Sequence, residues 1–188
     1  MPVAQSLCPP DILQAASQRI GQSPAEGLKA IEAAIADYPG DARLHFLKGS
    51  VLASFERYGE ACESMARAVE LAPEFSIARF QWGLLMFTSG DAVGAERAWA
   101  PLEKAPADPG LSEFVRGLRA LARDEFHAAV DWLRQGLAKN TSNPPLNHDM
   151  QMLIDEIGRK LADPAAIEDA TSPTHQLLQQ PVSKPTRH

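Results

Sequence analysis

Small and large apolar residues recur along this chain at one fixed spacing of 34 positions. Two columns of small residues lie twelve positions apart, and a column of large apolar residues follows four positions after the second. The columns are Ala15, Gly49, Gly83 and Gly117; Gly27, Ala61, Ala95 and Ala129; and Ile31, Met65, Trp99 and Leu133. This period is typical of stacked helical hairpins, in which only Gly or Ala leaves room for two helices to approach closely. The large column is expected to fill the layer between hairpins.

The same pattern predicts where the helices lie. Four pairs are expected, at residues 10–21 and 24–37, 42–55 and 58–71, 76–89 and 92–105, and 110–123 and 126–139. Ser23-Pro24 and Asp108-Pro109 mark helix starts, because Ser and Asp cap a helix and proline suits its first position. Pro101 falls inside the sixth helix, which is therefore expected to kink or end near Ala100.

One more helix is predicted after the pairs, at about residues 146–161. Its apolar residues share one face at helical spacing: Leu146, Met150, Leu153, Ile154, Ile157 and Leu161. Such a helix is expected to cap the last hairpin within residues 144–162. From residue 163 the composition becomes polar and rich in proline, with one short apolar island at Leu177-Leu178, so residues 163–188 are predicted to be a disordered tail.

The columns resemble the tetratricopeptide repeat (TPR). The clearest copy, residues 42–75, carries the family positions in order: Gly49, Leu52, Tyr58, Ala61, Met65, Ala68 and Pro73. The resemblance implies four copies, at residues 8–41, 42–75, 76–109 and 110–143, followed by the capping helix. It implies an all-α fold, a TPR superhelix or α-solenoid of antiparallel helical hairpins.

Composition narrows the function classes. The formal net charge is −6 and the Lys and Arg residues are scattered singly, which argues against nucleic acid as a partner. No apolar run is long enough for a membrane span, and the first residues lack the basic and apolar regions of a secretory signal. Two cysteines do not indicate a disulfide framework. The expected compartment is the cytoplasm.

No catalytic or metal-binding constellation is visible in the sequence. The five histidines lie far apart, and none has a partner at a metal-ligand spacing. The glycines fall on repeat columns rather than in a phosphate-binding loop. The chain is therefore predicted not to be an enzyme and to need no cofactor or metal.

The resemblance places function on a concave groove lined by the first helix of each hairpin. The expected partner-binding residues are apolar: Phe46, Ile77, Phe80, Leu84, Phe87, Leu111, Phe114, Leu118 and Leu121. The clamp that some TPR proteins use to grip a chaperone's carboxylate needs Lys, Asn and Arg in the groove, and it is absent here. An exposed apolar surface formed by these nine residues is too large to be left uncovered.

Two hypotheses remain open for what covers it. In the first, the chain is an adaptor or small chaperone that binds an apolar or amphipathic segment of a partner protein in the groove. Its size, acidity and apolar groove resemble, in kind, the small TPR chaperones of hydrophobic type III secretion translocators. In the second, the chain is a structural, self-associating subunit of a larger assembly. Its groove would then be filled by its own C-terminal region or by a second copy in a homodimer.

Overall fold

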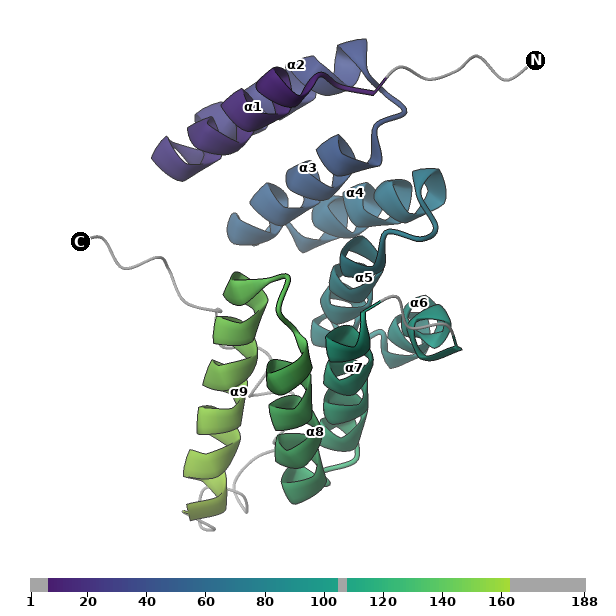
Figure 1. The fold of residues 1–188 in the computed structure, drawn as a ribbon, viewed down its shortest axis with the longest axis vertical. Helices are drawn as coiled ribbons and strands as arrows, with labels where there is room; N and C mark the ends of the chain where they lie inside the picture. The colour runs from purple at the N-terminus through teal and green to yellow at the C-terminus, as the bar shows by residue number, and fades with distance from the viewer. Residues whose placement is uncertain (1–6, 105–107, 163–188) are drawn as a thin grey trace. The chain divides into compact units, whose positions relative to one another are not determined.

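The structure is a computed structural model that describes residues 7–104 and 108–162, and in these residues it is built of helices (Figure 1). The helices are α1 (Pro10–Gln22), α2 (Pro24–Asp37), α3 (Ala42–Ser54), α4 (Tyr58–Leu71), α5 (Ser76–Thr88), α6 (Ala92–Lys104), α7 (Pro109–Ala122), α8 (Phe126–Lys139) and α9 (Pro144–Ala162). Each predicted helix is confirmed, with bounds that agree within two residues. The predicted tail at residues 163–188 lies outside the described residues.

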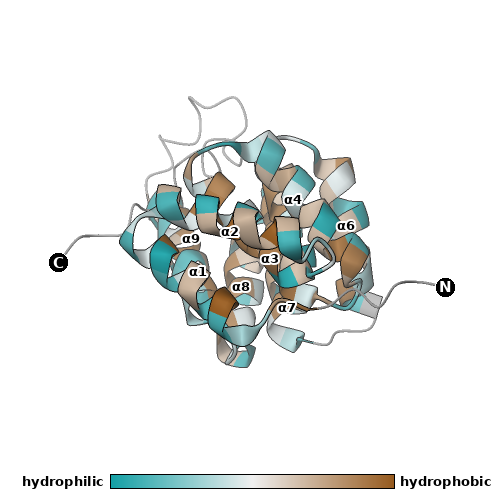
Figure 2. Cartoon of the chain, turned by 90° about the horizontal axis from the view of Figure 1, so that it is seen from above, coloured by the Kyte–Doolittle hydropathy of each residue, from teal (hydrophilic) through white to brown (hydrophobic). Residues whose placement is uncertain are grey.

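The chain divides into two compact units, Met1–Ala98 and Trp99–His188, and the division falls within α6. In the first unit, each helix from α1 to α4 packs against the next helix in the chain, and α1 also touches α3. In the second unit, α8 packs against both α7 and α9. Both teal and brown residues occur along individual helices in Figure 2, as expected for helices with one buried face.

The small residues of the two columns allow the two helices of a hairpin to approach closely, as their spacing predicts. A Cβ atom on Gly49 of α3 would lie 3.0 Å from the Met65 side chain and 3.1 Å from the Ala61 carbonyl oxygen on α4. Gly117 of α7 repeats this arrangement with Leu133 and the Ala129 carbonyl on α8, at 2.7 and 3.2 Å. The two small columns therefore meet within one hairpin. The large residue packs on the glycine of its own hairpin, whereas it was expected to fill the layer between hairpins.

Three hairpins share one turn, which the sequence did not reveal. The turn residue has a positive φ each time and recurs every 34 residues, at Glu56 (61°), Gly90 (89°) and Asp124 (57°). In each turn the following backbone N–H donates to a carbonyl five residues earlier, at 2.9–3.0 Å. This is the Schellman type of helix ending, which satisfies a carbonyl that the helix leaves unpaired. The turn between α1 and α2 differs, since Ser23 is extended there.

Two predicted helix starts can be compared directly. Asp108 caps α7, because its carboxylate accepts hydrogen bonds from the backbone N–H groups of Gly110 and Leu111 at 2.9 and 3.4 Å. Ser23 occupies the position before α2, but its side chain makes no capping hydrogen bond. Pro24 is the first residue of α2, as predicted.

Pro101 does not end α6, so of the two predicted outcomes, a kink or an end near Ala100, the end is wrong. The helix continues to Lys104 with the proline inside it. A proline can be held within a helix at the cost of one backbone hydrogen bond and local distortion. The carbonyl of Leu102, near the helix end, accepts a buried hydrogen bond from the Ser112 hydroxyl at 2.9 Å. That bond stabilises the last turn of the helix beyond the proline.

Candidate partner-binding surface

The nine predicted groove residues fall on three helices and in both units. Phe46 lies on α3; Ile77, Phe80, Leu84 and Phe87 lie on α5; and Leu111, Phe114, Leu118 and Leu121 lie on α7. Six of the nine side chains are buried: Phe80, Phe87, Leu111, Phe114, Leu118 and Leu121. The other three, Phe46, Ile77 and Leu84, are half-buried. Of the nine predicted groove residues, these three alone keep part of their apolar surface exposed.

In the second unit, the predicted residues of α7 belong to the packed interior. Ten of the 14 residues of α7 are buried, so this helix has little exposed apolar surface. The ring of Phe114 lies against Gly136 of α8, where an added Cβ would be 2.3 Å from a ring carbon. The aromatic side chain therefore fills the space between α7 and α8.

In the first unit, α5 presents a partly open apolar stripe. Ile77, Phe80, Leu84 and Phe87 follow helical spacing on one face, and the members alternate between half-buried and buried. Phe46 of α3 is half-buried as well and belongs to a cluster with residues of α4 and α5. We call Phe46, Ile77 and Leu84 the apolar strip.

The polar groups next to the apolar strip are occupied by their own helices. The Ser50 hydroxyl donates to the carbonyl of Phe46 at 3.0 Å, and the Thr88 hydroxyl donates to that of Leu84 at 3.0 Å. A partner bound at the strip would thus be held by apolar contacts in the first place, with few polar side chains to orient it.

A buried carboxylate ties the segment before α1 to the start of α3. Asp41 is fully buried and accepts hydrogen bonds from the backbone N–H of Cys8 (2.8 Å), from the backbone N–H of Arg43 (3.0 Å) and from the Arg43 guanidinium (2.5 and 2.9 Å). Burial by itself would raise the pKa of the Asp41 carboxyl. The Arg43 side chain and the backbone N–H groups of Cys8 and Arg43 lower this pKa by more than burial raises it, so the net pKa lies below the ordinary value. Asp41 is the N-cap of α3, and its bond to Cys8 had no sequence signal.

The two cysteines are free thiols, Cys8 buried and Cys62 half-buried. Burial is the largest cause that raises the pKa of both thiols. A thiol with a raised pKa carries little thiolate at neutral pH, so neither residue has the character of a nucleophile.

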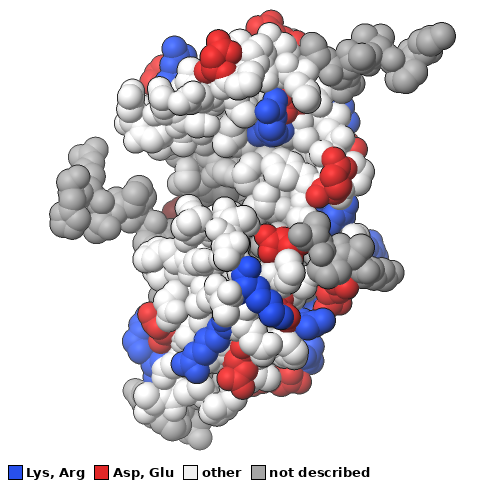
Figure 3. Space-filling view, viewed as in Figure 1, with Lys and Arg blue, Asp and Glu red and all other residues white. Residues whose placement is uncertain are grey.

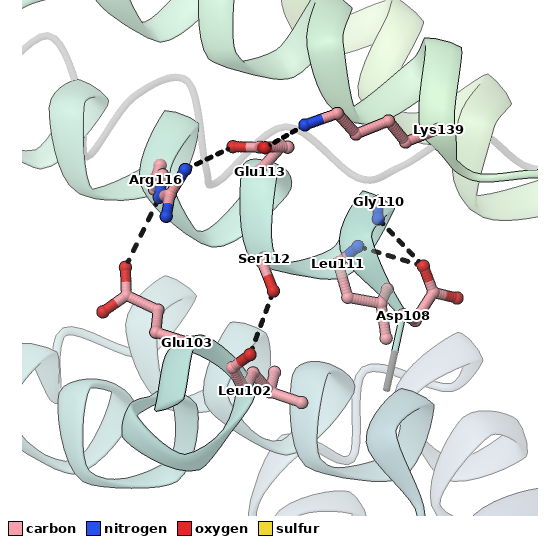
Figure 4. A network of polar contacts seen from close by, with 9 residues as sticks. All are labelled: Leu102, Glu103, Asp108, Gly110, Leu111, Ser112, Glu113, Arg116 and Lys139. Carbon is pink, nitrogen blue, oxygen red and sulfur yellow. Dashed lines mark hydrogen bonds and ion pairs between the residues drawn. The ribbon is translucent and has the colours of Figure 1, made fainter. Parts of the chain in front are cut away.

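A second polar network joins α6, α7 and α8 in the C-terminal unit (Figure 4). Glu113 of α7 is buried and accepts from Lys139 of α8 and from Arg116, the latter at 2.9 Å. Glu103 of α6 pairs with Arg119 at 2.5 Å, and the Arg116 guanidinium lies 5.1 Å from the Trp132 ring centre. A buried charge is tolerated when it is paired and hydrogen-bonded, so Lys139 and Arg116 compensate the buried Glu113 carboxylate.

A shallow depression of about 260 Å³ lies between α8 and α9. Its lining comprises His127, Val130, Asp131 and Arg134 of α8 and Ile154, Gly158 and Leu161 of α9. The lining combines the apolar side chains of Val130, Ile154 and Leu161 with the charged side chains of Asp131 and Arg134. Sequence reasoning had assigned Ile154 and Leu161 to the buried face of the capping helix and missed the depression.

The described part of the chain shows neither a metal-binding cluster nor a membrane-spanning helix. No group of three or more His, Cys, Asp or Glu residues there is placed to hold a metal ion. None of the described helices is long and apolar enough to cross a membrane. On the face shown in Figure 3, acidic and basic side chains are interspersed rather than gathered by sign.

Comparison with known proteins bears on the fold. No protein-family model and no curated protein matches this chain. Among solved structures it is similar to the crystal structure of MamA, with 16% identity and a TM-score of 0.57 over 68% of this chain and 75% of that chain. It is also similar to MamA 41-end from Desulfovibrio magneticus RS-1 and to the MamA RS-1 ArsTM double mutant. Their identities are 16% and 14%, both TM-scores are 0.56, and both cover 89% of this chain and 93% of theirs.

These neighbours are TPR-like helical solenoids, and the helical hairpins described above have the same architecture. The fold of this protein is therefore an all-α solenoid of the TPR type, as its columns predicted. At 14–16% identity the likeness concerns the fold alone.

Proposed function

We propose that this chain is a non-enzymatic protein-binding module that holds an apolar or amphipathic segment of a partner protein. The observation that carries the proposal is the apolar strip in the first unit, where Phe46, Ile77 and Leu84 keep part of their surface open on the first helices of two hairpins. A solenoid whose first helices carry apolar side chains suits an amphipathic helix or an extended apolar segment.

The strip alone supports only weak binding. Fully burying a large apolar side chain is worth about 1.5–3 kcal/mol, and these three side chains are already half-buried. They would contribute about 1 kcal/mol each, while association itself costs at least about 4 kcal/mol. A partner must therefore make further contacts beyond the strip, and we expect a transient complex.

In the narrower form of the proposal, the protein is a cytoplasmic adaptor or small chaperone built of four TPR copies and a C-terminal capping helix. The copies would span residues 8–41, 42–75, 76–109 and 110–143, with the cap at residues 144–162. The shared turn at Glu56, Gly90 and Asp124 supports this division for the last three copies. The small size and net charge of −6 are in keeping with a chaperone that covers a hydrophobic partner.

A second candidate is a structural, self-associating subunit. It is favoured by the burial of six of the nine predicted groove residues within a single chain. If that apolar surface is used to hold the chain together, function shifts to other faces and to assembly with further copies.

One crosslinking experiment separates the two candidates. A photoreactive residue replaces Ile77 in the apolar strip, and a control replaces Val93, which is 63% exposed and lies outside it. For a binding module, we expect a defined foreign protein to be crosslinked from position 77 and not from position 93. The purified partner should then bind the native chain and lose binding to Leu84→Asp. Crosslinks from position 77 only to a second copy or to the same chain would contradict partner capture and support the structural role.

A further inference from the structure

The depression between α8 and α9 leaves apolar surface open in the described part of the chain. Val130 of α8 and Leu161 of α9 line it and are half-buried, so each keeps part of its side chain exposed. Gly158 of α9 is exposed, and an added Cβ there would meet no atom within 4 Å. Gly49 and Gly117, by contrast, each lie closely against a side chain of the second helix of their own hairpin. Gly158 therefore leaves room for a further helix to approach α9 closely.

The same depression carries an acid and a base that do not pair. Asp131 and Arg134 lie three residues apart on α8, and both are exposed. Acids and bases at this spacing form ion pairs on four other helices, for example Glu26 and Lys29 on α2. Within the residues that the structure describes, Asp131 and Arg134 form neither this ion pair nor any other, and no hydrogen bond of their side chains occurs there. The surface thus offers one anion and one cation next to open apolar side chains.

We propose that a second copy of this chain covers the depression, in a two-fold dimer in which Asp131 of each copy pairs with Arg134 of the partner subunit. Two-fold symmetry brings a surface against itself, so the surface must be complementary to its own image. An acid and a base on one helix meet this condition. When the two α8 helices run antiparallel, position 131 of one copy lies opposite position 134 of the other, and each copy supplies the charge that the other lacks.

The mixed charge and the apolar side chains favour this occupant over a different partner. A partner with charges of one sign would leave either Asp131 or Arg134 unpaired, whereas a second copy pairs both. The half-buried Val130 and Leu161 would lose their remaining contact with water, which adds apolar burial to the ion pairs. The contact is small beside the roughly 1,200–2,000 Å² of a stable interface, so we expect a weak dimer. None of these residues belongs to the apolar strip, so the dimer does not depend on the proposed function.

The test is sedimentation equilibrium on the full chain at low salt, because salt screens exposed ion pairs. We expect the native chain to dimerise as its concentration rises toward about 1 mM. Arg134→Asp and Asp131→Arg each place like charges opposite each other, so each should weaken the dimer by about ten-fold or more. An equimolar mixture of these two variants should dimerise again, because every contact then joins an acid to a base. The double variant, in which the two residues are exchanged, should recover as well.

Two further variants separate the interface from indirect effects. Lys29→Asp changes the net charge as Arg134→Asp does, at an exposed site of the first unit, and should leave the dimer unchanged. Gly158→Gln places a larger uncharged side chain in the depression and should weaken the dimer while circular dichroism shows the same helix content.

Three results would overturn the proposal. The first is a native chain that stays monomeric, which would leave the depression open or covered in another way. The second is a dimer that Arg134→Asp weakens no more than Lys29→Asp does, which would place the contact on another face. The third is a mixture of the two charge variants that fails to dimerise, because Asp131 and Arg134 would then not face each other across the two copies.

Discussion

The turn after α3 allows a quantitative test of the repeat geometry. Glu56 is exposed and adopts a φ of 61°, in the left-handed region that favours glycine. The corresponding turn after α5 has Gly90 at 89°. No hydrogen bond or ion pair of the Glu56 side chain occurs among the described residues. Replacing this side chain therefore changes the backbone energy of the turn and little else.

Glu56→Gly is expected to stabilise the protein by about 0.5–1 kcal/mol. The left-handed conformation costs an L-residue about 1–2 kcal/mol, which glycine avoids. Glycine also gives the unfolded chain more freedom, which offsets the gain by about 0.4–1 kcal/mol. With a urea slope of about 2 kcal/mol/M, the unfolding midpoint should rise by about 0.4 M, measured by circular dichroism at 222 nm.

Two further variants separate backbone strain from other effects. Glu56→Ala removes the same carboxylate but keeps a Cβ, so it should not show the gain of Glu56→Gly. Gly90→Ala should lower the free energy of unfolding by about 1 kcal/mol, because a Cβ there meets nothing within 4 Å and only the conformational cost remains. Equal stability of the Gly and Ala variants at position 56 would refute the reasoning.

Three other predictions concern packing and charge. Gly117→Ala should lower the free energy of unfolding by about 1–3 kcal/mol, because the new methyl group would press against Leu133. Gly21→Ala, which has open space around it, is the control and should not lower it. Thermal unfolding of both variants measures the difference. Pro101→Ala should raise the unfolding midpoint, since proline inside a helix costs up to about 3 kcal/mol relative to alanine, and an unchanged or lower midpoint would show that the proline is needed. Asp41→Asn should destabilise by about 1–3 kcal/mol at pH 7. Because the pKa of Asp41 is lowered in the folded state, its contribution to stability is complete above about pH 4, the unfolded-state pKa of Asp. That contribution is lost as the pH falls toward the folded-state pKa. The free energy of unfolding of Asp41→Asn should therefore depend less on pH in the acid range than that of the native chain.

The period predicted the helices and their closest contacts because both depend on residue size at a fixed spacing. Gly49 and Gly117 each approach the second helix of their own hairpin, as small residues permit, although the large residues they meet, Met65 and Leu133, were expected between hairpins. The left-handed turns were not predictable in the same way, since only Gly90 of the three turn residues shows in the sequence that a positive φ is needed. Backbone geometry set by the flanking helices overrides the local preference of Glu56.

The open face of the first helices was the hardest feature to predict, and the opposing helix explains why. Phe46 and Phe114 occupy the same position of their copies, yet Phe114 is buried and Phe46 is half-buried. Phe114 packs against Gly136, which has no side chain, whereas the matching position in the earlier hairpin is Ala68, in the cluster that Phe46 packs against. A missing methyl group on the second helix leaves room for an aromatic ring to turn inward. Phe80, at the same position of the third copy, is buried although the matching residue there is Leu102, so the facing residue accounts for the difference between Phe46 and Phe114 but does not decide the exposure of this position in every copy.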